Sequence, residues 1–333
     1  MTFKIVYFFR KTRPSGNYSI ESYFEDVIRF LPKNLIAKKK IARYESTGLL
    51  KRLYILLAAI FNQGDINHIT GDIHFINLFL RKKKTILTIH DCGFMRNPSP
   101  PAQFILKWFW LKLPVWRSHI VTAVSESTKN EIIYYTGCNP EKIRVINTTV
   151  SEKYEFLRKE FNSLKPILLQ IGTAQNKNVE RLIPALDGIN CQLNIIGKLS
   201  PEQLLLLKQH NIDYLNSYNI SNEEMLSAYK NCDAVVFVST LEGFGMPIIE
   251  ANRVGRVVVT SNTSSMVEVA SDAACLVDPL DINSIRAGVL KIISDSTVRE
   301  QLITNGLKNK DRFLPGKIAE QYYFLYMELL NLN

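Results

Sequence analysis

Two glutamates and two glycines in one short segment could bind a phosphorylated ligand. Glu242 and Glu250 flank Gly-Phe-Gly-Met-Pro, residues 243–247, which follows a strand-like run and precedes a helical pattern. The first turn of a helix presents unpaired N–H groups and the positive end of its dipole, and glycine lets a ligand approach closely. The spacing favours an anion site, with Glu250 accepting hydrogen bonds from neighbouring hydroxyls. The alternative is a glycine turn with two solvated glutamates, because one Gly-x-Gly is a weak signal.

The elements that must position these residues alternate between strand-like and helix-like segments. Apolar runs rich in β-branched residues occur at 4–9, 66–70, 85–90, 120–124, 143–147, 167–171, 193–197, 234–239 and 256–260. Strand, helix, strand at this spacing predicts parallel sheets of the doubly wound type. We therefore expect an α/β protein with two Rossmann-like domains, 1–160 and 166–314, and a charged linker within 150–165.

Helix signals agree with this plan. Ser125 follows a predicted strand and opens a helix, and Ser221 with Glu224 three residues later forms a capping box. Apolar residues recur at helical spacing from Pro315 to Leu330, which predicts a terminal amphipathic helix within the segment 315–333.

Composition narrows the class of protein. The 333-residue chain is 46% hydrophobic and 22% charged, which excludes disordered, collagen-like and coiled-coil proteins. No apolar run approaches the roughly 18–20 residues that span a bilayer, and no secretory signal is recognised at the N-terminus, so we expect a cytoplasmic protein. Five cysteines without a C-x-x-C pair favour buried thiols over a disulfide framework or a zinc module.

Basic residues concentrate in the first half of the chain. Residues 1–165 hold 27 Lys and Arg against 13 Asp and Glu, whereas 166–333 hold 14 against 18. Trp108, Trp110 and Trp116 lie among lysines and an arginine within 104–117, which is typical of a peripheral patch on an anionic membrane. The alternative is a core helix with basic turns elsewhere. The same charge would suit nucleic acid, but no nucleic-acid-binding module is recognised, so none is expected to bind.

The segment from Glu242 to Glu250 resembles the E-x7-E signature of the retaining glycosyltransferases of family 4, which have the GT-B fold. The likeness continues through 261–269 and 272–279 and covers nearly the whole chain, most strongly 166–320. The resemblance implies an acceptor-binding N-terminal domain, a donor-binding C-terminal domain facing it across a central cleft, and a C-terminal helix that crosses back to the N-terminal domain.

The resemblance also assigns roles around the two glutamates. Glu242 would hold hydroxyls of the donor sugar, and Glu250 would hold the ribose. Backbone groups next to Glu242 and the start of the following helix would complete the donor site. The residues are Gly243, Phe244, Gly245, Met246 and Pro247.

A second segment, Ile171 to Asn178, resembles the glycine turn after the first strand of the family's donor domain. It implies that Gly172 and Thr173 line the donor and that Lys177 supplies a cation to its diphosphate. An ammonium there would stabilise the charge that grows on the leaving nucleotide. The alternative for Lys177 is a surface lysine at a helix start. Many relatives carry a second cation just after the glycine, where this chain has Thr173.

The remaining residues implied by the resemblance lie elsewhere. His90, at the end of a predicted strand, would face the donor sugar, although a lone histidine at a strand end is more often structural. Gly16 and Asn17 would belong to a loop near the donor phosphates and the acceptor, although relatives keep more glycines there. The nucleobase would lie near Gly197 and the pair Asn219 and Ile220.

The reaction implied is the transfer of a sugar, with retained anomeric configuration, from a nucleotide diphosphate sugar to a hydroxyl of a glycan acceptor. A lipid-linked acceptor of bacterial surface polysaccharide synthesis, at the inner face of the plasma membrane, is the pathway expected by family analogy. Asp-x-Asp, the metal-binding pair of the other large glycosyltransferase fold, is absent, so no metal or other cofactor is expected. The alternatives are an epimerase-type or phosphorylase GT-B enzyme and a non-catalytic nucleotide-sugar-binding protein.

Overall fold

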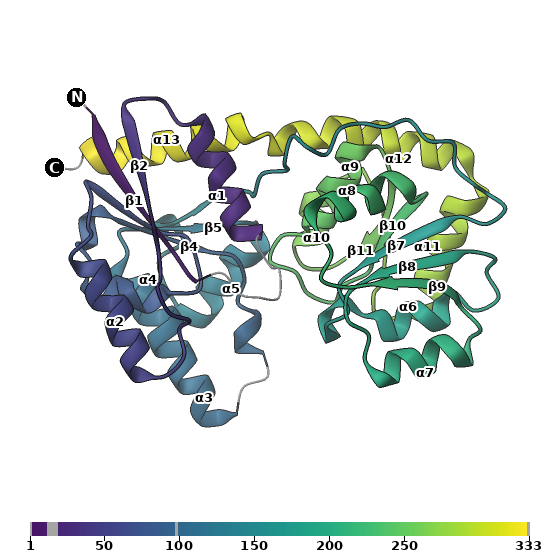
Figure 1. Ribbon diagram of the computed structural model, residues 1–333, viewed down its shortest axis with the longest axis horizontal. Helices are drawn as coiled ribbons and strands as arrows, with labels where there is room; N and C mark the ends of the chain where they lie inside the picture. Colours follow the sequence, from purple (N-terminus) through teal and green to yellow (C-terminus); the bar gives the residue numbers. More distant parts are fainter. Residues whose placement is uncertain (1, 12–18, 97–98, 332–333) are drawn as a thin grey trace. The chain divides into compact units, whose positions relative to one another are not determined.

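Two compact units form the chain. The computed structural model describes residues 2–11, 19–96 and 99–331 (Figure 1). The first unit comprises residues 1–149 with 315–333, and the second comprises 150–314.

The first unit is built on a parallel sheet whose described strands follow the order β2-β1-β3-β4-β5-β6. Every neighbouring pair in this sheet is parallel. The strands are β1 (Phe3–Phe9), β2 (Leu35–Ile41), β3 (Ile66–Ile69), β4 (Thr85–Ile89), β5 (Ile120–Ala123) and β6 (Ile143–Val145). Helices cover both faces, as the predicted doubly wound pattern requires.

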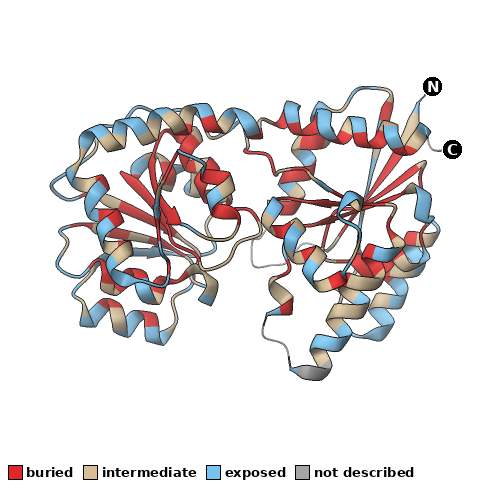
Figure 2. Cartoon of the chain, turned by 180° about the vertical axis from the view of Figure 1, so that it is seen from behind, coloured by how far each residue is buried: buried red, intermediate tan, exposed pale blue. Residues whose placement is uncertain are grey.

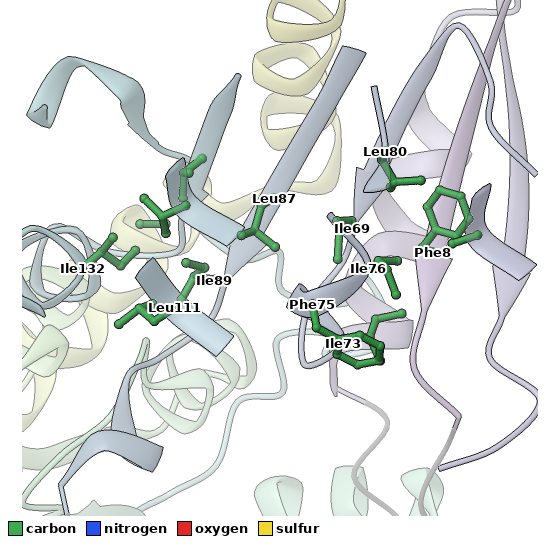
Figure 3. Close-up of a cluster of buried hydrophobic side chains, with 14 of the residues drawn as sticks. Phe8, Ile69, Ile73, Phe75, Ile76, Leu80, Leu87, Ile89, Leu111 and Ile132 are labelled. Atoms are coloured by element: carbon green, nitrogen blue, oxygen red, sulfur yellow. The ribbon is translucent and has the colours of Figure 1, made fainter. Parts of the chain in front are cut away.

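One face of this sheet carries a continuous apolar core (Figure 3). Leu87 and Ile89 of β4 pack there with Leu111 and Ile132, which come from the covering helical segments. The elements on this side are α2 (Leu49–Ile60), the 3-10 helix His74–Phe79, α3 (Pro100–Ile105), a π-helical stretch Leu106–Lys112, α4 (Leu113–Arg117) and α5 (Glu126–Thr136).

The other face is covered by α1 (Ser19–Phe30) and the terminal helix α13 (Pro315–Asn331). Tyr326 of α13 is buried, and its hydroxyl lies 2.7 Å from His68 Nδ1 and 2.9 Å from the Tyr7 hydroxyl. Ile318 and Tyr322 are buried in the same cluster. Helix α13 therefore belongs to the core of the first unit, although it follows the second unit in the sequence.

The second unit has a parallel sheet with the described order β12-β11-β10-β7-β8-β9. Its strands are β7 (Ile167–Ile171), β8 (Gln192–Ile196), β9 (Asp213–Ser217), β10 (Ala234–Phe237), β11 (Val257–Ser261) and β12 (Cys275–Val277). The helices are α6 (Val179–Ala185), α7 (Pro201–Gln209), α8 (Asn222–Asn231), α9 (Met246–Val254), α10 (Ser265–Ala270), α11 (Ile282–Ser294) and α12 (Ser296–Asn309). Figure 2 shows the central strands of both sheets as buried.

The nine predicted strands are all present, with ends that differ by one or two residues. The described residues form three further strands that were not predicted: β2, β9 and β12. Each lies at an edge of its sheet. An edge strand has one neighbour and stays partly in solvent, so it does not need an apolar run.

The segment 150–165 differs from the predicted linker, and the first unit ends at residue 149 rather than 160. It contains no helix or strand, but it is bonded to the second unit. Leu157 N donates to Val254 O at 3.2 Å, and Lys159 forms an ion pair with Asp233. The charged residues and the lack of helix or strand periodicity in 150–165 therefore correspond to an extended segment that packs on the second unit.

The described ranges contain neither a helix that could span a membrane nor a cluster of metal-binding side chains. No helix in 2–11, 19–96 or 99–331 is long and apolar enough to cross a bilayer. In that same part of the chain, no three His, Cys, Asp or Glu side chains cluster to hold a metal ion. The five cysteines are free; Cys92, Cys191 and Cys232 are buried, whereas Cys138 and Cys275 are partly buried.

Candidate functional site

The carboxyl ends of parallel strands meet at one edge of the second unit's sheet, where ligands of open α/β folds bind. Six loops start there, after the described strands β7, β8, β9, β10, β11 and β12. These loops carry the donor-site residues predicted in the C-terminal half, apart from Glu250 and the first helical residues. The fold therefore brings together segments separated by up to about 70 residues of sequence.

Lys177 and Glu242 are joined directly at this edge. Lys177 Nζ donates to Glu242 Oε1 at 2.6 Å, and the same ammonium lies 4.8 Å from the centre of the Phe237 ring. Both side chains are partly exposed, at 21% and 15%. The structure therefore pairs the cation and the carboxylate that the sequence assigned to different parts of one donor.

Gly172 allows this placement of Lys177. Its φ of +85° lies in the left-handed region, and a Cβ there would lie 2.9 Å from Lys177 Cε and 3.0 Å from Cγ. Asn178, which precedes α6, also has a left-handed φ of 60°. Its amide donates to Val238 O at 3.0 Å, which ties the loop after β7 to the loop after β10.

Further polar side chains that sequence reasoning missed fix Glu242 and its backbone. Asn176 Nδ2 donates to Leu241 O at 3.0 Å and lies 3.4 Å from Glu242 Oε1. Ser264 Oγ and Ser265 Oγ both donate to Glu242 O, at 2.8 and 3.0 Å. Ser264 and Ser265 lie within the segment that resembles the family, but their residue type alone does not reveal a supporting role.

Gly245 caps α9 with a φ of +115°, so the chain turns sharply into the helix at the predicted point. Pro247 occupies the first turn, where its missing N–H costs nothing. The Phe244 ring is buried and packs edge-on against Phe313, with ring centres 5.5 Å apart. Only the backbone of Phe244 is therefore available to a ligand, whereas the start of α9 presents a positive dipole end at this edge.

Glu250 lies one turn into α9 and is held by two tyrosines. Tyr229 of α8 donates its hydroxyl to Glu250 Oε2, and Tyr154, from the segment 150–165, also hydrogen-bonds to the carboxylate. The two rings meet edge-on, with centres 5.4 Å apart. Burial raises the pKa of Glu250, and the two hydroxyls oppose that rise only in part. Glu250 is therefore partly buried and hydrogen-bonded by two side chains rather than fully solvated.

Replacing Glu250 by glutamine should stabilise the ligand-free protein near neutral pH. Because the pKa of Glu250 is raised in the folded state, folding favours the protonated carboxyl. This stabilising contribution is complete below the ordinary pKa of 4.5 and is lost as pH rises through the raised pKa, where the buried group must ionise. We expect Glu250→Gln to unfold roughly 2–4 °C higher than wild type at pH 8, with the gap closing toward pH 4.5. Thermal unfolding at several pH values measures this. A Gln variant that unfolds at lower temperature at pH 8 would show that the ionised carboxylate is stabilising.

The region predicted to hold the nucleobase lies after β8 and β9, which are neighbours. Gly197 has a φ of +147°, and a Cβ there would lie 2.8 Å from Thr173 Cγ2. Thr173 Oγ1 donates to Lys198 O at 2.7 Å. Asn219 has a left-handed φ of 55°. Asn219 and Ile220 directly precede Ser221, the N-cap of helix α8. Thr173 thus ties two loops of the site together.

His90 belongs to the first unit, where it follows β4. Its Nε2 lies 2.7 Å from Thr70 O, and because a carbonyl oxygen only accepts, Nε2 carries the proton. Burial lowers the pKa of His90, so the ring is neutral at pH 7 and its Nδ1 is an acceptor. Gly71 (φ +145°) makes room, since a Cβ there would lie 2.9 Å from His90 Cδ2. A role for His90 toward a sugar in the second unit stays a prediction.

Gly16 and Asn17 lie outside the described residues.

The three tryptophans follow neither sequence interpretation as a group. Trp110 packs against the core and lies under Arg52, 4.4 Å from its guanidinium carbon, whereas Trp116 is 62% exposed. The segment 104–117 is therefore part covering helix and part surface.

Two family models match the chain. "Glycosyltransferase Family 4" matches residues 16–153, and "Glycosyl transferases group 1" matches residues 153–309. Together they account for most of the sequence, with the boundary near the division between the two units. The chain belongs to glycosyltransferase family 4.

Named relatives agree with this family. The serotype-specific mannosyltransferase WbdA of Escherichia coli is 26% identical over 225 residues, 59% of this chain. The chain spans only about a quarter of that relative's length, 27%. The capsular polysaccharide biosynthesis glycosyltransferase CapM of Staphylococcus aureus is 25% identical over 95% of this chain and 89% of its own length.

A solved structure has the same fold. HepE of Anabaena, crystallised with UDP-glucose, superposes with a TM-score of 0.78 at 14% identity, over 98% of this chain and 100% of that chain. The two Rossmann-like units are thus those of the GT-B fold, as predicted.

Proposed function

We propose that this glycosyltransferase moves a sugar from a UDP- or GDP-sugar to a hydroxyl of a lipid-linked glycan, with retention and without a metal ion. Its setting would be synthesis of a bacterial O-antigen, capsule or exopolysaccharide, as the names of CapM and of a further relative, an O-antigen chain mannosyltransferase of Escherichia coli, suggest. It would act in the cytoplasm, at the inner face of the plasma membrane.

The observation that carries the donor assignment is the Lys177–Glu242 pair beside the start of α9. A bound diphosphate would draw the Lys177 ammonium away from Glu242. The freed carboxylate would then accept hydrogen bonds from hydroxyls of the sugar. The ammonium and the helix dipole would then offset the charge of the leaving group, a task that a metal ion performs in other enzymes. This supports metal independence.

The reaction proposed is a same-face displacement. The bond between the anomeric carbon and the leaving phosphate oxygen breaks as the acceptor oxygen bonds to that carbon, and the acceptor proton passes to the departing phosphate. No side chain acts as nucleophile. The neutral His90 would accept a hydrogen bond at Nδ1 from a hydroxyl of the donor sugar. Glu250 would accept hydrogen bonds from the ribose hydroxyls.

Donor binding is tested by thermal stabilisation with UDP, GDP, ADP and their sugars in the presence of EDTA. A ligand that binds only the folded state raises the unfolding temperature. We expect a selective rise with one nucleotide, and a loss of that rise in Glu250→Ala, because charged hydrogen bonds to the ribose disappear. Calorimetry should show donor affinity at least about tenfold weaker in this variant. Absence of a rise with every nucleotide would overturn the donor-site assignment.

A further inference from the structure

Helix α2 of the first unit is apolar on its outward face as well as its inward one. Ile55 and Ala59 face inward and are buried. The opposite side carries a stripe of exposed apolar residues: Leu49 (82%), Leu50 (81%), Leu53 (50%), Tyr54 (43%), Leu57 (45%) and, just beyond the helix, Phe61 (82%). These positions recur every three to four residues and fall on one side of the helix.

Such a face needs an occupant. A surface helix normally turns charged residues to water, and one that is apolar all round is normally covered. Single exposed leucines need no explanation, but a contiguous apolar stripe marks a binding surface. The stripe is independent of the donor site, which lies in the second unit.

The charge around the stripe identifies the occupant. Residues 35–61 contain Lys38, Lys39, Lys40, Arg43, Lys51 and Arg52 against a single acidic residue, Glu45. The three lysines lie on the edge strand β2; Lys38 is exposed, whereas Lys39 is paired with Glu25 of α1 at 2.7 Å. Apolar residues flanked by cations match an anionic bilayer, which offers hydrocarbon below negative headgroups.

A cavity beside α2 has the same character. Its volume is about 160 Å³, and it opens between the end of β2 and the helix. Ile41, Tyr54, Ala58 and Ile73 line it together with Lys40 and Arg43. An apolar lining with two cations suits part of a lipid chain and its phosphate.

A second copy of the chain fits this face less well. A symmetric dimer would place the same cations of two copies against each other, and like charges across an interface are repulsive. An anionic bilayer has the opposite sign.

We infer that α2, with β2 and the cavity between them, docks the protein on an anionic lipid bilayer. The apolar stripe lies in the headgroup region, and the neighbouring lysines contact the lipid phosphates. This surface differs from the segment 104–117, for which the sequence left a membrane patch and a core helix open. The inference rests on the proposed function only in that a lipid-linked acceptor explains why the enzyme needs a membrane.

Flotation with vesicles tests the inference. Wild-type protein should bind vesicles of 70% phosphatidylcholine and 30% phosphatidylglycerol, bind pure phosphatidylcholine weakly, and lose binding as salt rises. The triple variant Leu50→Ser, Leu53→Ser, Leu57→Ser should bind the anionic vesicles at least about tenfold less. A charge variant, Lys38→Gln, Lys40→Gln, Lys51→Gln, should lose most of the preference for phosphatidylglycerol.

Phe324→Ser is the matched control, because Phe324 is 62% exposed on α13 of the same unit, and this variant should bind as wild type does. Thermal stabilisation by nucleotide, measured on each variant, reports folding and donor binding separately. The inference is overturned if wild type ignores anionic vesicles or the leucine variant binds them equally. It is also overturned if light scattering shows a dimer that the leucine variant dissociates. A retained nucleotide response would then leave the proposed function standing.

Discussion

Replacing Lys177 by methionine should lower kcat by roughly 10²- to 10³-fold, the usual effect of removing one group that stabilises developing charge. In the proposed reaction, negative charge grows on the diphosphate as the donor bond breaks. The Lys177 ammonium, which would offset that charge, is positioned by Gly172, whose missing Cβ leaves space for the aliphatic stem, and by the Phe237 ring. Methionine keeps the stem and removes the charge, so packing is preserved.

The control variants separate charge from shape. Lys177→Arg should retain more activity than Lys177→Met, because it keeps the cation but changes its geometry. Lys208→Met, on the exposed surface of α7, should be neutral. Initial rates at saturating donor, in EDTA, measure the effect. Full activity of Lys177→Met would remove Lys177 from the mechanism.

Replacing Glu242 by glutamine should have two opposite effects. Transfer should fall by about 10²-fold, because the carboxylate proposed to accept hydrogen bonds from the sugar hydroxyls is lost. A nucleoside diphosphate without its sugar should bind about fivefold tighter, roughly 1 kcal/mol, because Glu242 no longer holds Lys177 at 2.6 Å or repels the phosphates. A residue with a purely structural role would not tighten binding of a product.

Calorimetry with the free nucleotide and rate measurements with the full donor test this pair of effects. Glu300→Gln, exposed on α12, is the control for a change of charge alone and should alter neither quantity. If Glu242→Gln weakened the nucleotide and the sugar donor equally, the ion pair with Lys177 would not compete with the diphosphate.

The sequence predicts the central strands well and the edges poorly. Val235 and Val258 lie in strands buried on both faces, so their segments read as apolar runs. Strand β9, by contrast, is Asp-Tyr-Leu-Asn-Ser with all five residues exposed, and β2 contains three consecutive lysines. Those strands are held by backbone pairing to β8 and β1, which side-chain pattern does not record.

Prediction of the site divides in the same way. Residues within one loop, such as Gly172 and Lys177, are recognisable through the family resemblance because they lie together in one short segment of sequence. The partners of Glu250 are not recognisable. Tyr154 lies 96 positions away, in a segment without helix or strand, and only the folded chain places it against the carboxylate. The pairing of Lys177 with Glu242 likewise depends on β7 and β10 being neighbours in the sheet.

The most direct test of the central claim is sugar transfer itself. Purified protein is incubated with the radiolabelled sugar form of the nucleotide that stabilises it, with bacterial lipid extract as acceptor and with EDTA. The account predicts label in the lipid phase with wild type and at least about 10²-fold less with Lys177→Met. Donor that binds but yields neither labelled lipid nor free sugar would contradict the account, and the chain would then be a nucleotide-sugar-binding protein without transferase activity.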